Sequence, residues 1–236
     1  MGLRGLLPGR RPRPTPGTAL ADLAEASAVD RGTPLAEVQL LALDLETTGL
    51  DPRRHEVLSV GHVPVVQGRI VLAQARHELV RPQGPVGESA VHHGLTDDRL
   101  AHGPDLALVL PGVLEALRTG GGEGVRPVRR VLLAHFAQIE TAFLSAACRR
   151  LYGTEVPLQV VDTLTLAQRM LRVPTPELAS GRLRLDACRR HYRLPRYRAH
   201  SALTDALACA ELFLAQSAEL AEQHGRPLRL GDVLAR

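Results

Sequence analysis

Two strand-like segments joined by a single tight turn limit most strongly how this chain can fold. Residues 57–66 and 70–80 are rich in β-branched and apolar side chains, and Gln67 and Gly68 lie between them. So short a connection allows only an antiparallel pair. The other short apolar runs, at 39–46, 128–134 and 159–162, are separated by longer segments, and the later of these segments have helical spacing. Paired strands first, and then strands alternating with helices, predict an α/β fold: a mixed sheet flanked by helices.

The helical segments and the ends of the chain suggest three regions. Apolar spacing predicts helices at 105–117, 139–152, 163–171, 185–192 and 202–221, the first of them interrupted by Pro111 and Gly112. Residues 1–17 combine arginine with proline and contain no acidic residue, a composition typical of disorder. Thr18 could cap a short helix that follows. We therefore expect a basic, proline-rich and largely disordered extension (1–36), a folded domain (37–220) and a C-terminal tail (221–236).

The composition indicates a soluble cytoplasmic protein. Apolar residues make up 44% of the chain, enough for a hydrophobic core, yet no run approaches the 18 apolar residues of a membrane-spanning helix. The N-terminus lacks the apolar core of a signal peptide. The three cysteines, Cys148, Cys188 and Cys209, are odd in number and widely spaced, which favours buried thiols in a reducing compartment.

The charge suits a polyanion partner but does not identify one. All 29 basic residues are arginine, and the net charge is +4. Aromatic residues make up only 3% of the chain. This scarcity argues against a surface that binds single strands by stacking many bases on aromatic rings.

The apolar run at 39–46 ends in two carboxylates. Asp44 and Glu46 are two residues apart, so in a strand they project from the same face. Two carboxylates held together repel each other unless a cation joins them, and their hard oxygens suit magnesium or manganese. Gly49, after Thr47 and Thr48, permits a sharp exit from the strand. The alternative is a strand that ends in polar turn residues.

A second pair lies near the C-terminus, at His200 and Asp205. Five residues apart on one helix, these side chains would face different directions. We therefore place His200 in a loop and Asp205 in the helix that follows, with Ser201 as a candidate cap. A histidine beside a fixed carboxylate suits a general base next to a metal ligand. The alternative is a surface histidine and a first-turn aspartate that the helix dipole stabilises.

A third acidic position, Glu140, lies where the apolar run at 128–134 gives way to a helix. It is either a carboxylate of the site or another first-turn acid. Nearby, we interpret His135 as a half-buried structural residue. Asp162 precedes the helix expected at 163, so N-capping explains it without a catalytic role.

Taken in order, these motifs resemble those of the DEDDh exonucleases. The acids Asp44 and Glu46, an acid near 140, and then His200 and Asp205 match that family across about residues 38–218. Residues 91–96 are similar to the family's V-H-G-I-T turn. The family includes the proofreading epsilon subunit of bacterial DNA polymerase III, ribonuclease T and oligoribonuclease.

The resemblance implies a ribonuclease-H-like fold and metal-dependent 3′→5′ exonuclease activity that releases nucleoside monophosphates from DNA or RNA. It implies two divalent cations, Mg²⁺ or Mn²⁺, with Asp44 bridging both, Glu46 and Asp205 holding one and Glu140 serving the second. His200 would deprotonate the attacking water. The terminal nucleotide would be held by Thr47, Thr48 and Leu50. Two cations suit the reaction, because its transition state places negative charge on both the attacking and the leaving oxygen.

Two positions depart from the family pattern H-N-x-x-F-D. Phe136 replaces the asparagine and Glu140 replaces the aspartate. Glutamate adds a methylene, which shifts the carboxylate by roughly an ångström, and a misplacement of that size can cost about 10²-fold in rate. At this level, Glu140→Asp is expected to raise the rate. The departures also motivate a second hypothesis, a catalytically weakened module of the same fold that binds nucleic acid or another partner.

The expected partner is therefore the 3′ end of a nucleic-acid strand, and no membrane is expected. The sequence does not distinguish DNA from RNA, because discrimination of the 2′-hydroxyl depends on the shape of the pocket. It contains no clear clamp-binding motif, and it does not decide whether a polymerase or a second copy of the chain is a partner.

Overall fold

The computed structural model describes residues 12–120, 126–172, 181–197 and 200–235, and its centre is a six-stranded sheet. Five strands follow the order β3-β2-β1-β7-β8, and β4 also pairs with β2. β1 pairs antiparallel with β2 and parallel with β7, which pairs parallel with β8. The predicted mixed sheet is therefore confirmed. The strands are β1 (Leu40–Thr47), β2 (Val57–Val66), β3 (Arg69–Ile70), β4 (Arg76–Leu79), β7 (Val131–Ala134) and β8 (Val160–Asp162), with β5 (Arg118–Thr119) and β6 (Val128–Arg129) forming a separate ribbon.

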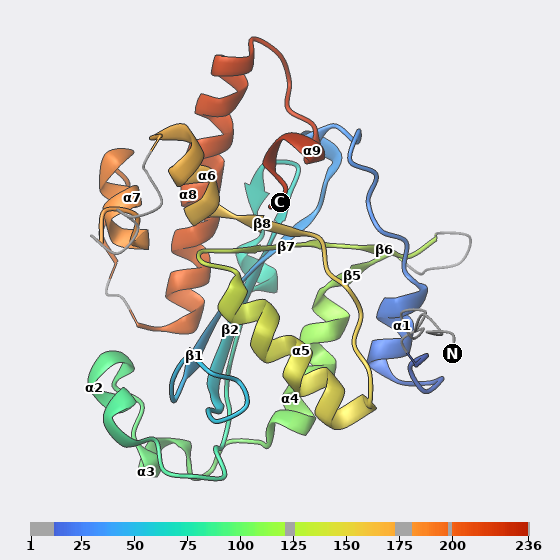
Figure 1. The fold of residues 1–236 in the computed structure, drawn as a ribbon, viewed down its shortest axis with the longest axis vertical. Helices are drawn as coiled ribbons and strands as arrows, with labels where there is room; N and C mark the ends of the chain where they lie inside the picture. Colours follow the sequence, from blue (N-terminus) through green and yellow to red (C-terminus); the bar gives the residue numbers. More distant parts are fainter. Residues whose placement is uncertain (1–11, 121–125, 173–180, 198–199, 236) are drawn as a thin grey trace, which may run out of the picture.

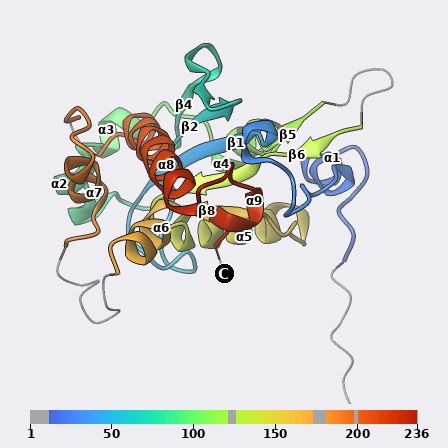
Figure 2. The same ribbon diagram turned by 90° about the horizontal axis from the view of Figure 1, so that it is seen from above.

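Helices flank the sheet (Figures 1 and 2). Alternate side chains of β1 enter two hydrophobic cores: Leu41 and Leu43 pack with α1, α4 and α5, whereas Leu40 and Ala42 pack with α6, α8 and α9. Within the part of the chain described, no helix is long and apolar enough to cross a bilayer. The α-helices are α1 (Ala19–Glu25), α2 (Ala90–His93), α3 (Asp97–Leu100), α4 (Leu106–Ala116), α5 (Gln138–Tyr152), α6 (Thr163–Met170), α7 (Leu185–His191), α8 (Ala202–His224) and α9 (Leu230–Val233), and short 3-10 turns lie at Leu35–Glu37, Leu72–Gln74 and Gly87–Ser89.

Two local predictions differ from the structure. The strand expected at 70–80 is split into β3 and β4 by a 3-10 turn. Opposite this break lies Pro64 of β2, which has no N–H to donate to a ladder; its carbonyl accepts from Val71, where the chain leaves the sheet. Conversely, α4 continues through Pro111. Its buried face, including Val109 and Val113, holds the helix together despite the lost hydrogen bond.

Both ends of the chain are folded further than predicted. The helix expected after Thr18 is α1, and its Leu20 and Leu23 are fully buried, so this part of residues 1–36 belongs to the folded structure. Residues 1–11 lie outside the described part. At the other end α8 continues to residue 224, and α9 buries Leu230. The two ends also meet, since the Leu35 amide donates to the Leu228 carbonyl. The folded domain is therefore wider than 37–220, because a few leucines complete the core within segments of polar average composition.

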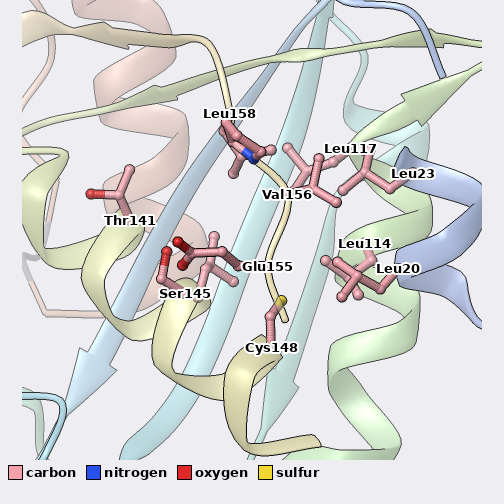
Figure 3. A pocket seen from close by; sticks show the side chains of 12 residues that line it. Leu20, Leu23, Leu114, Leu117, Thr141, Ser145, Cys148, Glu155, Val156 and Leu158 are labelled. Atoms are coloured by element: carbon pink, nitrogen blue, oxygen red, sulfur yellow. The ribbon is translucent and has the colours of Figure 1, made fainter. Parts of the chain in front are cut away.

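Helix α1 also closes one side of an apolar cavity of about 210 Å³ (Figure 3). Leu20 and Leu114 face it from α1 and α4, and Glu155 and Ser145 provide its polar side. None of the predicted site residues lines this cavity. The candidate chemistry lies elsewhere, where β1, α5 and α8 meet.

Candidate active site

The second half of β1 carries the first two predicted carboxylates. Asp44 and Glu46 alternate with buried leucines and project from one face of the sheet. On β2, Gly61 lies directly opposite Asp44, and Ser59 lies opposite Glu46. Both carboxylates are half-buried, so their charges lie close together where water solvates them poorly.

Asp205 reaches this pair because the first turn of α8 rests on Gly61. A Cβ atom at position 61 would lie 2.0 Å from the Leu203 backbone nitrogen and 2.1 Å from the carbonyl carbon of Ala202. Only glycine admits so close an approach. As a result, one oxygen from each of Asp44, Glu46 and Asp205 lies within 4.8 Å of the others. Gly61 was missed at the level of sequence, where it is simply one glycine in a strand.

The electrostatics of this cluster fit a divalent cation. The pKa of Asp44 is raised well above its usual range by burial and by the charges of Glu140, Asp205 and Glu46. Burial and then Asp205 raise the pKa of Glu46 to about 7, and burial raises the pKa of Asp205. Oxygens that share one Mg²⁺ or Ca²⁺ at the usual ~2.0–2.6 Å are at most about 5 Å apart, so the three carboxylates can hold one ion. Such an ion would remove the repulsion between them.

The fourth predicted carboxylate, Glu140, lies in the first turn of α5 and is 4% exposed. Its Oε2 has no hydrogen-bond partner within the described part of the chain. Burial and, after it, the charge of Asp162 raise the pKa of Glu140 to about 8. Glu140 is not a member of the 4.8 Å cluster, but its charge raises the pKa of Asp44, so the two carboxyls are neighbours. A buried carboxylate with an unpaired oxygen beside this cluster is suited to a second cation or its bound water.

Asp162 and His135 support this arrangement without joining the cluster. Asp162 caps α6 by accepting from the Leu164 amide, and it also accepts from the amides of Phe136 and Ala137 at 2.9 and 3.2 Å. It thereby holds the turn before α5 in place. His135 lies between the Thr163 hydroxyl and the Leu183 carbonyl, at 2.9 Å from each. These contacts agree with the capping and structural roles that the sequence suggested.

His200 lies in the loop immediately before α8. Its backbone amide donates to Oδ2 of Asp205 at 2.8 Å, and its φ of 71° is left-handed. Ser201 occupies the N-cap position but makes no side-chain capping bond. The side chain of Asp205 thus faces the cluster and also holds the loop, because it accepts the hydrogen bond from the backbone of His200. His200 itself is exposed.

The residues predicted to hold the terminal nucleotide form the turn after β1. The Thr47 hydroxyl donates to the Gly49 carbonyl at 2.8 Å, and the Thr48 hydroxyl accepts from the Glu56 amide at 2.9 Å. Leu50 is 72% exposed. The two threonines therefore shape a turn that presents an apolar side chain to solvent.

This set of residues agrees with a family comparison. The sequence model of the RNase_T family, described as an exonuclease, matches residues 41–213. The chain belongs to this exonuclease family. The matched segment contains all five residues predicted to be catalytic, which are Asp44, Glu46, Glu140, His200 and Asp205.

Individual members of the family are similar to this chain in the same region. The chain is 30% identical over 175 residues to "DNA polymerase III PolC-type" of Thermotoga petrophila, a match that covers 74% of this chain but 11% of that protein. It is 28% identical over 190 residues to "DNA polymerase III subunit epsilon" of Treponema pallidum, covering 80% of both. This chain therefore corresponds to about a tenth of the PolC-type relative.

A solved structure supports the fold. The nuclease domain of 3′hExo, described as a DEDDh family member bound to rAMP, has a TM-score of 0.63 and 17% identity, covering 86% of this chain and 99% of that domain. The predicted ribonuclease-H-like fold and the resemblance to the DEDDh exonucleases are confirmed.

An additional network, which the sequence did not indicate, holds part of the segment between α7 and His200. Arg189 of α7 is only 4% exposed. Its guanidinium donates to the carbonyls of Ala208 and Pro195 and to the carboxylate of Glu211, and it lies 4.7 Å from the ring centre of Tyr197. The Tyr197 hydroxyl donates to the same carboxylate at 2.8 Å. This network holds Pro195 and Tyr197 against α8.

Tyr197→Phe is expected to lower kcat by about 2- to 10-fold, the range that corresponds to one ordinary hydrogen bond. The substitution removes the hydroxyl that donates to Glu211 and leaves the ring beside Arg189. Because the network positions the loop of His200 rather than the substrate, KM should change less than kcat. An unchanged kcat, or a loss confined to KM, would contradict this role.

The carboxylate cluster also predicts how stability depends on pH without metal. The folded pKa values of Glu46 and Glu140, about 7 and about 8, lie above the ordinary value of 4.5. The contribution of these two carboxyls to stability is therefore fully present below about pH 4.5. It is lost as pH rises through the folded pKa values. In EDTA, Tm should fall between about pH 4.5 and pH 8. Mg²⁺ should raise Tm more at the alkaline end, where the carboxyls are already ionised. Differential scanning fluorimetry of wild type and Glu46→Gln measures this, and the variant should show a shallower fall; equal slopes would refute the assignment.

Proposed function

We propose that this exonuclease removes nucleoside monophosphates from the 3′ ends of DNA or RNA with the help of two divalent cations, Mg²⁺ or Mn²⁺. The observation that carries the proposal is the convergence of Asp44, Glu46 and Asp205 within 4.8 Å, with Glu140 beside them. The names of the relatives support it: one is an epsilon subunit, and the solved DEDDh domain was bound to rAMP.

Each residue would have a distinct role in hydrolysis. When bound, two cations would stabilise negative charge on the attacking and leaving oxygens. Asp44 would contact both positions, with Glu46 and Asp205 completing one and Glu140 serving the other. His200 would accept the proton of the attacking water, while the turn of Thr47 and Thr48 would present Leu50 to the terminal base.

Digestion of labelled oligonucleotides tests this function. Matched DNA and RNA strands, single- and double-stranded, would carry a label at either end and be incubated with Mg²⁺, Mn²⁺ or EDTA. With a 5′ label, we expect a ladder that shortens one nucleotide at a time and nucleoside monophosphates as products. Release of the 5′-terminal label as mononucleotide before any shortened strand appears, internal cleavage, or activity in EDTA would contradict the proposal.

A second candidate is a binding module that has lost activity, which the substitutions at Phe136 and Glu140 favour. Such a protein would bind a single strand without shortening it under any metal condition. Binding and digestion measured on the same preparation distinguish the two candidates.

Glu140→Asp is expected to lower kcat, by about 10²-fold if the carboxylate withdraws by an ångström. The sequence pattern alone suggested a gain, but the structure favours the opposite outcome. The longer side chain of Glu140 already places its charge close enough to raise the pKa of Asp44, so shortening it would move the carboxylate away from the cluster. Steady-state rates of wild type, Glu140→Asp and Glu140→Gln in Mg²⁺ and Mn²⁺ test this. Wild-type activity in Glu140→Gln would show that Glu140 is not part of the metal site.

A further inference from the structure

Phe136 lies at the edge of the candidate active site and does not contribute to the core. Of the three phenylalanines, Phe143 and Phe213 are buried, whereas Phe136 is 39% exposed. Phe136 belongs to none of the hydrophobic clusters formed by the described residues. Its ring is therefore held at the surface of a protein that has few aromatic rings.

The backbone at this position is unfavourable for phenylalanine. Phe136 has a φ of 70°, in the left-handed region where glycine and asparagine fit and bulky side chains are strained. The conformation is imposed by Asp162, whose carboxylate accepts from the amides of Phe136 and Ala137. The chain thus keeps a turn suited to a small polar residue and places a large exposed ring on it. Strain of this kind indicates a functional use for the side chain.

The turn lies at the same edge of the sheet as the carboxylates. β7 runs parallel to β1 with Leu133 opposite Ala42, so the chain beyond β7 continues to the level of Asp44. Four residues after Phe136, Glu140 is close enough to raise the pKa of Asp44. Figure 1 shows the start of α5, which follows this turn, near β1 and on the side of the sheet edge where α8 begins.

We propose that the Phe136 ring is a stacking platform for one nucleobase of the bound strand, next to the phosphodiester that is hydrolysed. The inference rests on the proposed function and adds a base-binding subsite to it. A flat apolar ring accepts any base, because every base has a π face. Phe143 and Phe213 are buried, and the ring of Tyr197 is already in contact with Arg189, so the subsite holds a single base and not an extended run.

Variants at position 136 test the proposal through affinity and stability together. Phe136→Asn suits the left-handed backbone but cannot stack, and Phe136→Leu keeps an apolar side chain. Leu151→Ala is the control, since Leu151 is similarly exposed near the far end of α5. Fluorescence anisotropy of a labelled single strand in Ca²⁺ gives Kd, steady-state digestion in Mg²⁺ gives KM and kcat, and scanning fluorimetry gives Tm.

We expect Phe136→Asn to weaken strand binding by roughly 5- to 100-fold, the range for loss of one base–aromatic stack, and to raise Tm because the strain is relieved. Phe136→Leu should fall between this variant and wild type in affinity, and Leu151→Ala should bind as wild type does. Single abasic sites moved one at a time along the 3′ end identify the stacked base: at one position, the missing base should weaken binding by wild type but not by Phe136→Asn.

Wild-type affinity in Phe136→Asn, a lower Tm in that variant, or equal loss from the abasic site in both proteins would overturn the inference. Failure of the proposed function gives a different result. If wild type binds the strand but does not shorten it, the anisotropy and abasic measurements still decide whether Phe136 stacks on a base.

Discussion

Replacing Asp44 by alanine is expected to abolish hydrolysis, with a loss of about 10³-fold or more in kcat. Asp44 is the central carboxylate of the site, because its pKa responds to Glu140, Asp205 and Glu46 together. Removing it leaves the other carboxyls without the group that would contact both cation positions. The same change should raise Tm in EDTA, since it removes one charge from a buried and repulsive cluster. Activity and stability should therefore move in opposite directions.

Single-turnover digestion in saturating Mg²⁺ and scanning fluorimetry in EDTA measure the two effects. The matched control is Asp105→Asn, which removes the charge of an aspartate that pairs with Arg81 at 2.9 Å on the surface. The control should retain wild-type activity. Near-normal turnover of Asp44→Ala would refute the metal site, and a large fall in its Tm would show that Asp44 has a structural role instead.

The parts of this fold that follow from local pattern could be predicted from sequence. The alternation at Asp44 and Glu46 predicts a shared face because side chains in a strand alternate by geometry alone. The limits of α5 and the start of α8 follow from the apolar spacing of neighbouring residues. Asp162 could be interpreted as a cap because capping depends on residues next in sequence.

Features that depend on distant contacts could not be predicted in this way. The network of Arg189, Glu211 and Tyr197 joins α7, α8 and the loop between them, and an arginine in a short amphipathic helix gives no sign that it is buried. Leu20 and Leu230 belong to segments of ordinary polar composition, and only the assembled core shows that they are fully buried. The close approach of α8 to β2 likewise depends on a glycine whose partner is about 140 residues away in sequence.

That approach determines whether the carboxylates meet. Gly61 lies opposite Asp44 in the β1–β2 ladder, and the backbone of Ala202 and Leu203 lies against it. Asp205 follows within the same turn of α8, so the separation of α8 from the sheet sets the distance between Asp205 and Asp44. Backbone atoms form the contact on both sides, so no side-chain rotation can make room for a methyl group.

Gly61→Ala is therefore expected to reduce hydrolysis by about 10²-fold or more, because a shift of roughly 1 Å in a catalytic group can have that effect. It should also destabilise the fold by at least about 1–3 kcal/mol, the usual range for overpacking. The control is Gly112→Ala in α4, where an added Cβ meets no atom within 4 Å; it should stabilise the protein by about 0.5–1 kcal/mol and leave activity unchanged.

Urea unfolding gives the stabilities, and Mg²⁺-dependent increases in Tm show whether the cluster still binds metal. If Gly61→Ala folds with wild-type stability, metal response and activity, the close packing of α8 on β2 is not what assembles the site. If it folds with reduced stability and has lost its Mg²⁺ response, the position of α8 controls metal binding, since no metal-binding side chain has been altered.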